Sequence, residues 1–330
     1  MQYVRFGNTD LQISRVGFGA WAIGGEAQVG GIPIGWGPTD DSVSIKALHK
    51  ALDCGITFYD TADFYGLGHS EELIGKTFGN RPDVAIATKV GQRQGDNNTI
   101  QIDYTPTYVR KACEQSLRRL RREAIDFYQL HVARVVHLES GELEAILQTL
   151  QQEGKIRWYG ISLLTFAPEP EAEFCLENRF GHGFQVVYNI FNQLITPYLQ
   201  LMQQGGYGVI ARMPLQFGLL TGKFDANSSF LPTDHRSFRL SKPVLQEAAK
   251  LLQPLLEMAQ AYGMSLTELA FSFVLSNTAI STVIPGIRTP EQAMRNANIP
   301  PALSETDRKW LVQFWQEDCQ QLFSLMKQQG

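Results

Sequence analysis

Short apolar runs alternate with segments of helical periodicity along most of the chain. Buried parallel strands are typically continuous apolar runs, so this alternation indicates an α/β barrel or a doubly wound sheet. Eight such runs favour a (β/α)8 TIM barrel over the open sheet. They cover residues 16–20, 56–59, 84–87, 125–130, 156–161, 184–188, 208–211 and 282–284. Helices are expected near residues 42–54, 71–78, 108–121, 143–152 and 169–177.

Three segments stand outside this alternation of strands and helices. Residues 2–15 alternate apolar and polar positions around a turn signal at residues 7–10, which predicts an N-terminal β-hairpin. Residues 223–240 are polar and rich in turn residues, so we expect a long loop over the site. An extra C-terminal helix is expected near residues 306–326. No segment reads as a linker, and we expect one domain over residues 1–330.

Composition narrows the classes of protein. The 29 Lys and Arg residues oppose 33 Asp and Glu residues without a long run of one sign, so nucleic acid is not an expected partner. No apolar run approaches the roughly 20 residues of a membrane helix, so we expect a cytoplasmic protein without membrane contact. The cysteines form neither a disulfide framework nor, with the histidines, a metal-ligand spacing, so we expect reduced thiols and no metal. They are Cys54, Cys113, Cys175 and Cys319.

Three of the predicted strands end on a polar or charged side chain, namely Asp60, Lys89 and His131. In a barrel the carboxyl ends of all strands converge on one face, so these side chains are expected to meet there. Tyr65 lies five residues after Asp60 and is expected to lean over the same point. Taken alone, each residue is better explained as an ordinary solvated strand-end residue, but the convergence of four weakens that explanation and favours a site.

The chemistry of these four residues is coherent. Carbonyl reduction needs a proton donor at the oxygen, and a tyrosine with an unperturbed pKa of about 10 is a poor acid at neutral pH. The Lys89 ammonium would favour the phenolate form of Tyr65, and Asp60 would hold that ammonium in place. His131 would hydrogen-bond the substrate oxygen and orient it.

The segment FYDTADFYG at residues 58–66, followed by SEELIG at 70–75, resembles the signature of the aldo-keto reductase family. The resemblance continues over nearly the whole chain, through ATK at 87–89, LH at 130–131, GKIR at 154–157, GIS at 160–162, GLLTGK at 218–223 and IPG at 284–286. It implies a catalytic tetrad of Asp60, Tyr65, Lys89 and His131. It also implies a monomeric or weakly oligomeric barrel with NADP(H) extended across its carboxyl face.

The resemblance further implies residues that contact the cofactor and the substrate. Trp21 would form a wall of the substrate pocket, although a role as a core aromatic is equally open, and Phe64 is a second expected pocket residue. Two positions depart from the family pattern: Ser162 is followed by Leu163 instead of asparagine, and Arg212 replaces a tyrosine that often stacks on the nicotinamide. A planar guanidinium can still stack or pair with phosphate. The other expected cofactor residues before the last strand are Gly19, Ala20, Gln185, Pro214, Leu215, Gly218, Leu219 and Lys223.

Glycines at residues 17 and 19 also fit the pattern of a Rossmann fold. A Rossmann turn must open a helix that receives the pyrophosphate, but residues 23–38 form a glycine-rich loop. The glycine pattern therefore does not predict a Rossmann fold.

The end of the last strand is the expected site of the adenosine 2′-phosphate of NADPH. Pro290 suits the first turn of a helix, whose unpaired N–H groups attract anions, and Arg288 precedes it. In the family Gln292 and Asn296 would face the adenine, and Pro285 and Gly286 would contact the cofactor. Because Arg288 is the one charged residue expected at the phosphate, we expect NADPH to be preferred and NADH to bind more weakly. The alternative is that Arg288 is a solvated loop arginine.

These observations predict an NADPH-dependent reductase of small aldehydes or ketones. One alternative is a nicotinamide-binding regulatory barrel resembling potassium-channel β subunits, which has the same tetrad and turns over slowly. A phosphosugar isomerase or aldolase would need a Schiff-base lysine or a carboxylate base. Lys89 could be that lysine, but Tyr65 and the cofactor segments would then have no role. Aromatic residues near the expected site indicate an aromatic or apolar pocket and do not identify the substrate.

Overall fold

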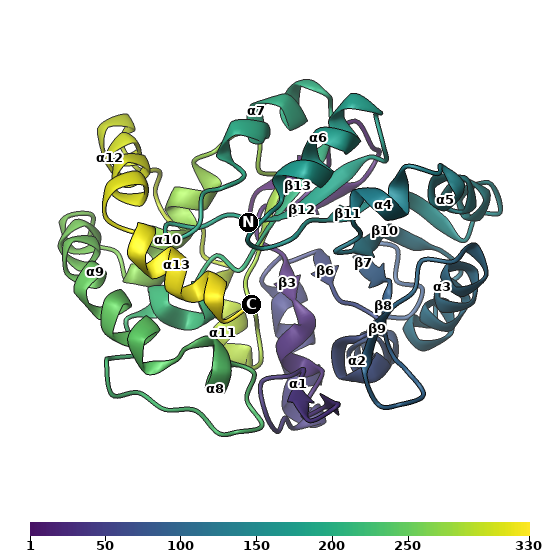
Figure 1. Cartoon of the computed structure of the whole chain (residues 1–330), viewed down its shortest axis with the longest axis horizontal. Coiled ribbons are helices and arrows are strands. Elements are labelled where there is room, and N and C mark those ends of the chain that lie inside the picture. The colour runs from purple at the N-terminus through teal and green to yellow at the C-terminus, as the bar shows by residue number, and fades with distance from the viewer.

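The computed structural model describes residues 1–330 and contains eight parallel strands enclosed by helices, so the predicted (β/α)8 barrel is confirmed (Figure 1). The sheet has the order β14-β13-β12-β11-β10-β7-β6-β3. Parallel bridges between Val16 and Val283 and between Gly19 and Gly286 join the first and last strands. The strands are β3 (Phe18–Gly19), β6 (Phe58–Asp60), β7 (Ala85–Val90), β10 (Ile125–His131), β11 (Ile156–Ser162), β12 (Gly183–Val187), β13 (Gly208–Arg212) and β14 (Thr282–Ile284).

Helices cover the outside of the barrel, and several begin at residues that the sequence favours for helix starts. Asp40 accepts hydrogen bonds from the backbone N–H groups of Ser42 and Val43 at the first helix, and Thr105 caps the third. The helices are α1 (Asp41–Asp53), α2 (His69–Thr77), α3 (Pro106–Leu120), α4 (Val135–Leu138), α5 (Glu142–Gln152), α6 (Glu169–Glu177), α7 (Thr196–Gln204), α8 (Arg236–Arg239), α9 (Lys242–Ala261), α10 (Leu266–Leu275), α11 (Pro290–Asn296), α12 (Glu305–Glu317) and α13 (Gln320–Gln328). No helix combines the length and the apolar character needed to cross a membrane.

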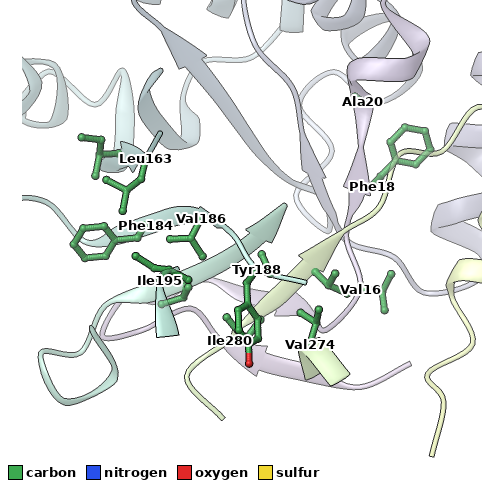
Figure 2. Packing of buried hydrophobic residues seen from close by; sticks show 14 of the residues in the cluster. Val16, Phe18, Ala20, Leu163, Phe184, Val186, Tyr188, Ile195, Val274 and Ile280 are labelled. Atoms are coloured by element: carbon green, nitrogen blue, oxygen red, sulfur yellow. The ribbon is translucent and has the colours of Figure 1, made fainter. Parts of the chain in front are cut away.

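The core lies mainly between the outer face of the strands and the helices, where 74 buried residues form one cluster. Figure 2 shows part of this cluster, with side chains from β12 and from the segment before β3 among those of surrounding elements. The labelled residues are Val16, Phe18, Ala20, Leu163, Phe184, Val186, Tyr188, Ile195, Val274 and Ile280.

A second, smaller cluster fills the amino end of the barrel. The predicted N-terminal hairpin is present as β1 (Tyr3–Arg5) and β2 (Gln12–Ser14). Between its strands Phe6 is fully buried, with its ring centroid 4.9 Å from that of Phe127 and 6.4 Å from that of Phe58. Side chains alternate along a strand, so the interior positions of β6 and β10 pass from these apolar rings to polar groups at the carboxyl end.

Three expected segments need correction. The final helix expected near residues 306–326 is divided into α12 and α13, because a turn at Asp318 lets Phe323 pack back against Trp315, with ring centroids 5.1 Å apart. α13 packs beside α9, and α12 lies on the same side of the molecule, opposite α3 and α5 (Figure 1). Residues 223–240 contain the short helix α8, and residues 23–38 contain the paired strands β4 (Gln28–Val29) and β5 (Ile32–Pro33). A further hairpin, β8 (Gln92–Gln94) with β9 (Ile100–Ile102), has no counterpart in the predicted elements.

Candidate active site

Strand ends bring Asp60, Lys89 and Tyr65 into direct contact. The Lys89 Nζ lies 2.7 Å from Asp60 Oδ2, 2.8 Å from the backbone oxygen of Thr61 and 3.2 Å from Tyr65 Oη. Asp60 is the last residue of β6, Lys89 lies near the end of β7, and Tyr65 opens the turn after β6. The parallel register places the end of β6 beside β7, which accounts for the meeting of residues that are far apart in sequence.

The Lys89–Asp60 ion pair is buried, since Lys89 is 0% and Asp60 2% exposed. Burial alone would lower the pKa of Lys89, but the charge of Asp60 and the contact with Tyr65 outweigh it and raise that pKa above its ordinary value. Its three neighbours use all three N–H donors of the ammonium, as a buried charge requires. Lys89 is therefore a fixed cation in contact with the Tyr65 hydroxyl.

His131, the last residue of β10, faces the Tyr65 ring almost at a right angle, with centroids 6.0 Å apart and 82° between the planes. Burial, followed by the charges of Lys89 and Arg212, lowers the pKa of His131 well below its ordinary value. The imidazole is therefore neutral at pH 7. Its Nδ1 atom is buried without a hydrogen-bond partner, and Tyr104 holds the backbone by donating to the His131 carbonyl at 2.5 Å.

The second carboxylate oxygen of Asp60 is held by two glutamine amides. Gln129 Nε2 donates to Asp60 Oδ1 at 3.1 Å, and Gln185 Nε2 donates to the same atom at 2.7 Å. Gln129 was not among the residues expected from the sequence. A signal was available, because Gln129 is a polar residue two positions before His131 in an apolar strand and therefore points to the same face.

Aromatic rings cover the exposed side of Tyr65. The Trp21 ring centroid lies 6.0 Å from that of Tyr65 with 24° between the planes, and 4.9 Å from that of His235. Trp21 is partly exposed, and its Nε1 donates to the Ile34 carbonyl at 2.7 Å. Trp21 thus lies at the mouth of the site. Phe64, the other expected pocket residue, is 8% exposed and lies in a separate small cluster under residues 29–34.

Above these rings the expected loop at residues 223–240 pairs with a second loop, a contact that was not expected from the sequence. The backbone of Trp36 pairs with Asp234, and the His235 N–H donates to the Gly35 carbonyl at 2.9 Å. The His235 ring accepts from Arg239 Nε at 3.0 Å, and its Nδ1 lies 2.9 Å from the Pro33 carbonyl oxygen. The Arg236 guanidinium pairs with Asp234 and lies 5.1 Å from the centroid of the Trp36 ring. Residues 223–240 and 28–38 therefore close over the carboxyl face together.

The expected cofactor residues divide into accessible and buried groups. Accessible residues follow the carboxyl face and include Arg212, whose guanidinium donates to the Leu163 carbonyl and the Thr165 hydroxyl and has no acidic partner. The others are Leu215, Gly218, Lys223, Gly286, Arg288 and Gln292. The residues buried in this structure are Gly19, Ala20, Ser162, Gln185, Pro214, Leu219, Pro285 and Asn296.

The residues at this face fit a nicotinamide dinucleotide. Besides His131 Nδ1, the Arg212 Nε is a buried polar atom without a partner, and such atoms favour a ligand that pairs with them. Arg288 donates to the carbonyls of Trp36 and Pro38 at 3.2 and 2.7 Å. Burial and the nearby Arg236 lower the pKa of Arg288, so two cations face each other across Asp234 at this end. Anionic groups of a ligand would relieve that repulsion.

Comparisons with known proteins agree with this geometry. Residues 15–308 match the profile of the aldo/keto reductase family. The chain is 33% identical to aldo-keto reductase YhdN of Bacillus subtilis, over 88% of this chain and 86% of that protein. It is 28% identical to the NADH-specific methylglyoxal reductase of Escherichia coli, over 93% and 96%. The structure of a glycerol dehydrogenase from Gluconobacter oxydans is similar with a TM-score of 0.79 and 30% identity, covering 96% of this chain and 95% of that one.

Proposed function

Because the chain belongs to the aldo/keto reductase family, we propose that it reduces small aldehydes or ketones with NADPH as the preferred cofactor and Tyr65 as the proton donor. Membership makes it a nicotinamide-dependent oxidoreductase that acts on carbonyl groups. The single observation that carries the role of Tyr65 is the 3.2 Å contact between its hydroxyl and the buried Lys89 ammonium.

Reduction needs a hydride at the carbonyl carbon and a proton at its oxygen, and a bound reduced nicotinamide supplies the hydride. Tyr65 gives its proton to the carbonyl oxygen, while the adjacent Lys89 ammonium stabilises the negative charge that develops on the phenol oxygen. Asp60 keeps Lys89 charged and in place. The neutral His131 donates a hydrogen bond that holds the carbonyl oxygen near Tyr65.

The preference for NADPH rests on the cations at the end of β14. Arg288 and Arg236 lie at the same rim, and Asp234 balances only one of them. A surplus positive charge favours the 2′-phosphate that distinguishes NADPH from NADH. The relative named as NADH-specific is a reason to test this preference directly, because family membership does not fix it.

The test uses the purified full chain and initial rates of cofactor oxidation with 4-nitrobenzaldehyde. We expect kcat/KM for NADPH to exceed that for NADH by about tenfold or more, the value of one charge-assisted phosphate contact. Equal values, or a higher value for NADH, would overturn the proposed preference for NADPH. The proposed reductase activity would still stand. Tight NADPH binding without oxidation of either cofactor would instead support a regulatory barrel.

A further inference from the structure

We propose that Gln129 is a positioning residue that couples the nicotinamide-binding side of the site to the Asp60–Lys89 pair. This inference rests on the function proposed above and adds a residue to its machinery. Gln129 and Gln185 are both 0% exposed, and their amides form one connected group with Asp60 and Ser162. Asp60 and Ser162 end β6 and β11, Gln129 lies two residues before the end of β10, and the register pairs Gln185 of β12 with Ser162.

The hydrogen bonds fix which way each amide points. Gln185 Nε2 has two N–H donors, and they go to Asp60 Oδ1 at 2.7 Å and to Gln129 Oε1 at 3.2 Å. Gln129 Nε2 in turn donates to Asp60 Oδ1 at 3.1 Å. A reversed Gln185 amide would put its oxygen against a carboxylate oxygen and against the Gln129 oxygen, with no proton between them. The reversed arrangement is therefore excluded by two contacts at once.

The consequence for ligand binding is that Gln185 presents its oxygen away from Asp60. That oxygen accepts from Ser162 Oγ at 3.4 Å, a long contact that leaves acceptor capacity free. A primary carboxamide has N–H donors that match such an acceptor. Gln129 thus prepares Gln185 to receive the amide of a nicotinamide ring.

The consequence for the catalytic pair is that Asp60 does not depend on Gln185 alone. If Gln185 moves toward a ligand, Gln129 still donates to Asp60 Oδ1 while Lys89 holds Oδ2. The carboxylate keeps donors on both oxygens, so the position of the Lys89 ammonium under Tyr65 is preserved. Gln129 acts through Asp60 and Gln185 and does not itself contact the Tyr65 hydroxyl.

Another buried glutamine shows what a purely structural role looks like. Gln193 is 2% exposed, and its Nε2 donates to the backbone carbonyls of Ile190 and Leu311. It has no contact with an ionised side chain. Gln193→Met therefore controls for the loss of a buried amide as such.

The experiment compares Gln129→Met, Gln185→Met, the double variant and Gln193→Met in the full chain. We measure the Kd of NADPH by fluorescence titration, kcat and KM with 4-nitrobenzaldehyde, and Tm. For Gln129→Met we expect a fall in kcat of about tenfold or more, because a hydrogen bond to a carboxylate is lost. We also expect a severalfold rise in Kd that is not additive with the effect of Gln185→Met. Gln193→Met is expected to lower Tm while kcat and Kd stay within about twofold.

Three outcomes would overturn the inference. One is a Gln129→Met variant with unchanged kcat and Kd, and the second is a change matched by Gln193→Met. The third is strict additivity of the two single changes. If Gln129→Met does not fold, Gln129→Leu replaces it in the same comparison. Failure of the proposed function differs from all of these, because then wild-type protein itself binds or oxidises no nicotinamide cofactor.

Discussion

The carboxyl face of the barrel contains two regions of different construction. We call Asp60, Lys89, Gln129 and Gln185 the strand-end cluster. Its members are 0–2% exposed, and their mutual hydrogen bonds are 2.7–3.2 Å long. The loop rim comprises Trp36, Asp234, Arg236 and Arg288, which come from three loops and are mostly part-exposed.

This difference indicates that the two regions have different functions. Parallel register fixes the backbone positions from which the side chains of the strand-end cluster project. In the rim, the Trp36 ring lies within 3.4 Å of where a Cβ on Gly286 would stand. The Trp36 ring therefore packs beside the backbone of Gly286. Changes in the cluster should therefore act mainly on the chemical step and on folding, with a smaller effect on cofactor affinity, and changes in the rim should act mainly on which ligand binds.

The largest effect is expected for Tyr65→Phe, which removes the hydroxyl in contact with Lys89 and little else. Loss of a general acid lowers kcat by about 10²–10⁴-fold. NADPH affinity, followed by fluorescence titration, should stay within about twofold because the binding surface is unchanged. Retention of more than about a tenth of wild-type kcat, a loss under about 1.4 kcal/mol, would contradict the assignment.

Lys89→Met tests whether the strand-end cluster also matters for folding. The change leaves the Asp60 carboxylate buried without its cation, which costs about 3–5 kcal/mol of unfolding free energy. Urea unfolding measures that loss, and kcat should fall about as far as in Tyr65→Phe. Lys155→Met is the control, because Lys155 pairs with Glu114 and Glu153 at the surface and should lose far less stability. Equal losses of unfolding free energy in the two variants would show that the buried Lys89–Asp60 pair contributes no more to stability than a surface ion pair.

Much of the strand-end cluster was predictable from the sequence because strands have a period of two and parallel strands align their ends. Asp60, Lys89 and His131 each close an apolar run, so their convergence followed from the fold. Gln129 was missed because it lies inside an apolar run, where its spacing from His131 indicates the face it occupies but not its hydrogen bond to Asp60. The pattern gives the face of a strand but not which polar side chains on that face bond to each other.

The loop rim was far less predictable, for a physical reason. The pairing of Trp36 with Asp234 joins two irregular segments about 200 residues apart, and no local periodicity specifies it. Arg288 was found from the helix start at Pro290, but its donation to the Trp36 and Pro38 carbonyls depends on that pairing. The division of the last helix at Asp318 likewise depends on the packing of Phe323 against Trp315.

Arg288→Ala tests the claim that the rim selects the cofactor. Charge-assisted contacts to phosphate are worth about 1.5–3 kcal/mol, so KM for NADPH should rise by about ten- to a hundredfold. KM for NADH and the rate at saturation should change little. The KM values for NADPH and NADH, measured with 4-nitrobenzaldehyde as substrate, show whether Arg288 contributes to cofactor selection. An equal rise in KM for both cofactors would mean that Arg288 supports the loop at Trp36 and does not bind the 2′-phosphate.

The smallest effect concerns the pH dependence of the contact between the two loops at His235. Burial, partly offset by the hydrogen bond with the Pro33 carbonyl, lowers the pKa of His235 to about 4. In the unfolded chain a histidine titrates near 6.5, so between about pH 6.5 and pH 4 the unfolded state binds the extra proton. Stability from this group is complete above about pH 6.5 and is lost as the pH falls toward 4. Allowing for partial exposure, the loss is on the order of 2 kcal/mol.

The matched variant for this last effect is His235→Gln, whose amide can still donate to the Pro33 carbonyl but does not titrate. Urea unfolding of both proteins at pH 7, 6 and 5, at constant ionic strength, gives the two pH slopes. All other titrating groups are common to both proteins, so the difference in slope belongs to His235. We expect the wild type to lose more unfolding free energy than the variant over this range. Identical slopes would mean that the loops part at His235 without unfolding, so that the ring titrates as freely in the folded chain as in the unfolded one.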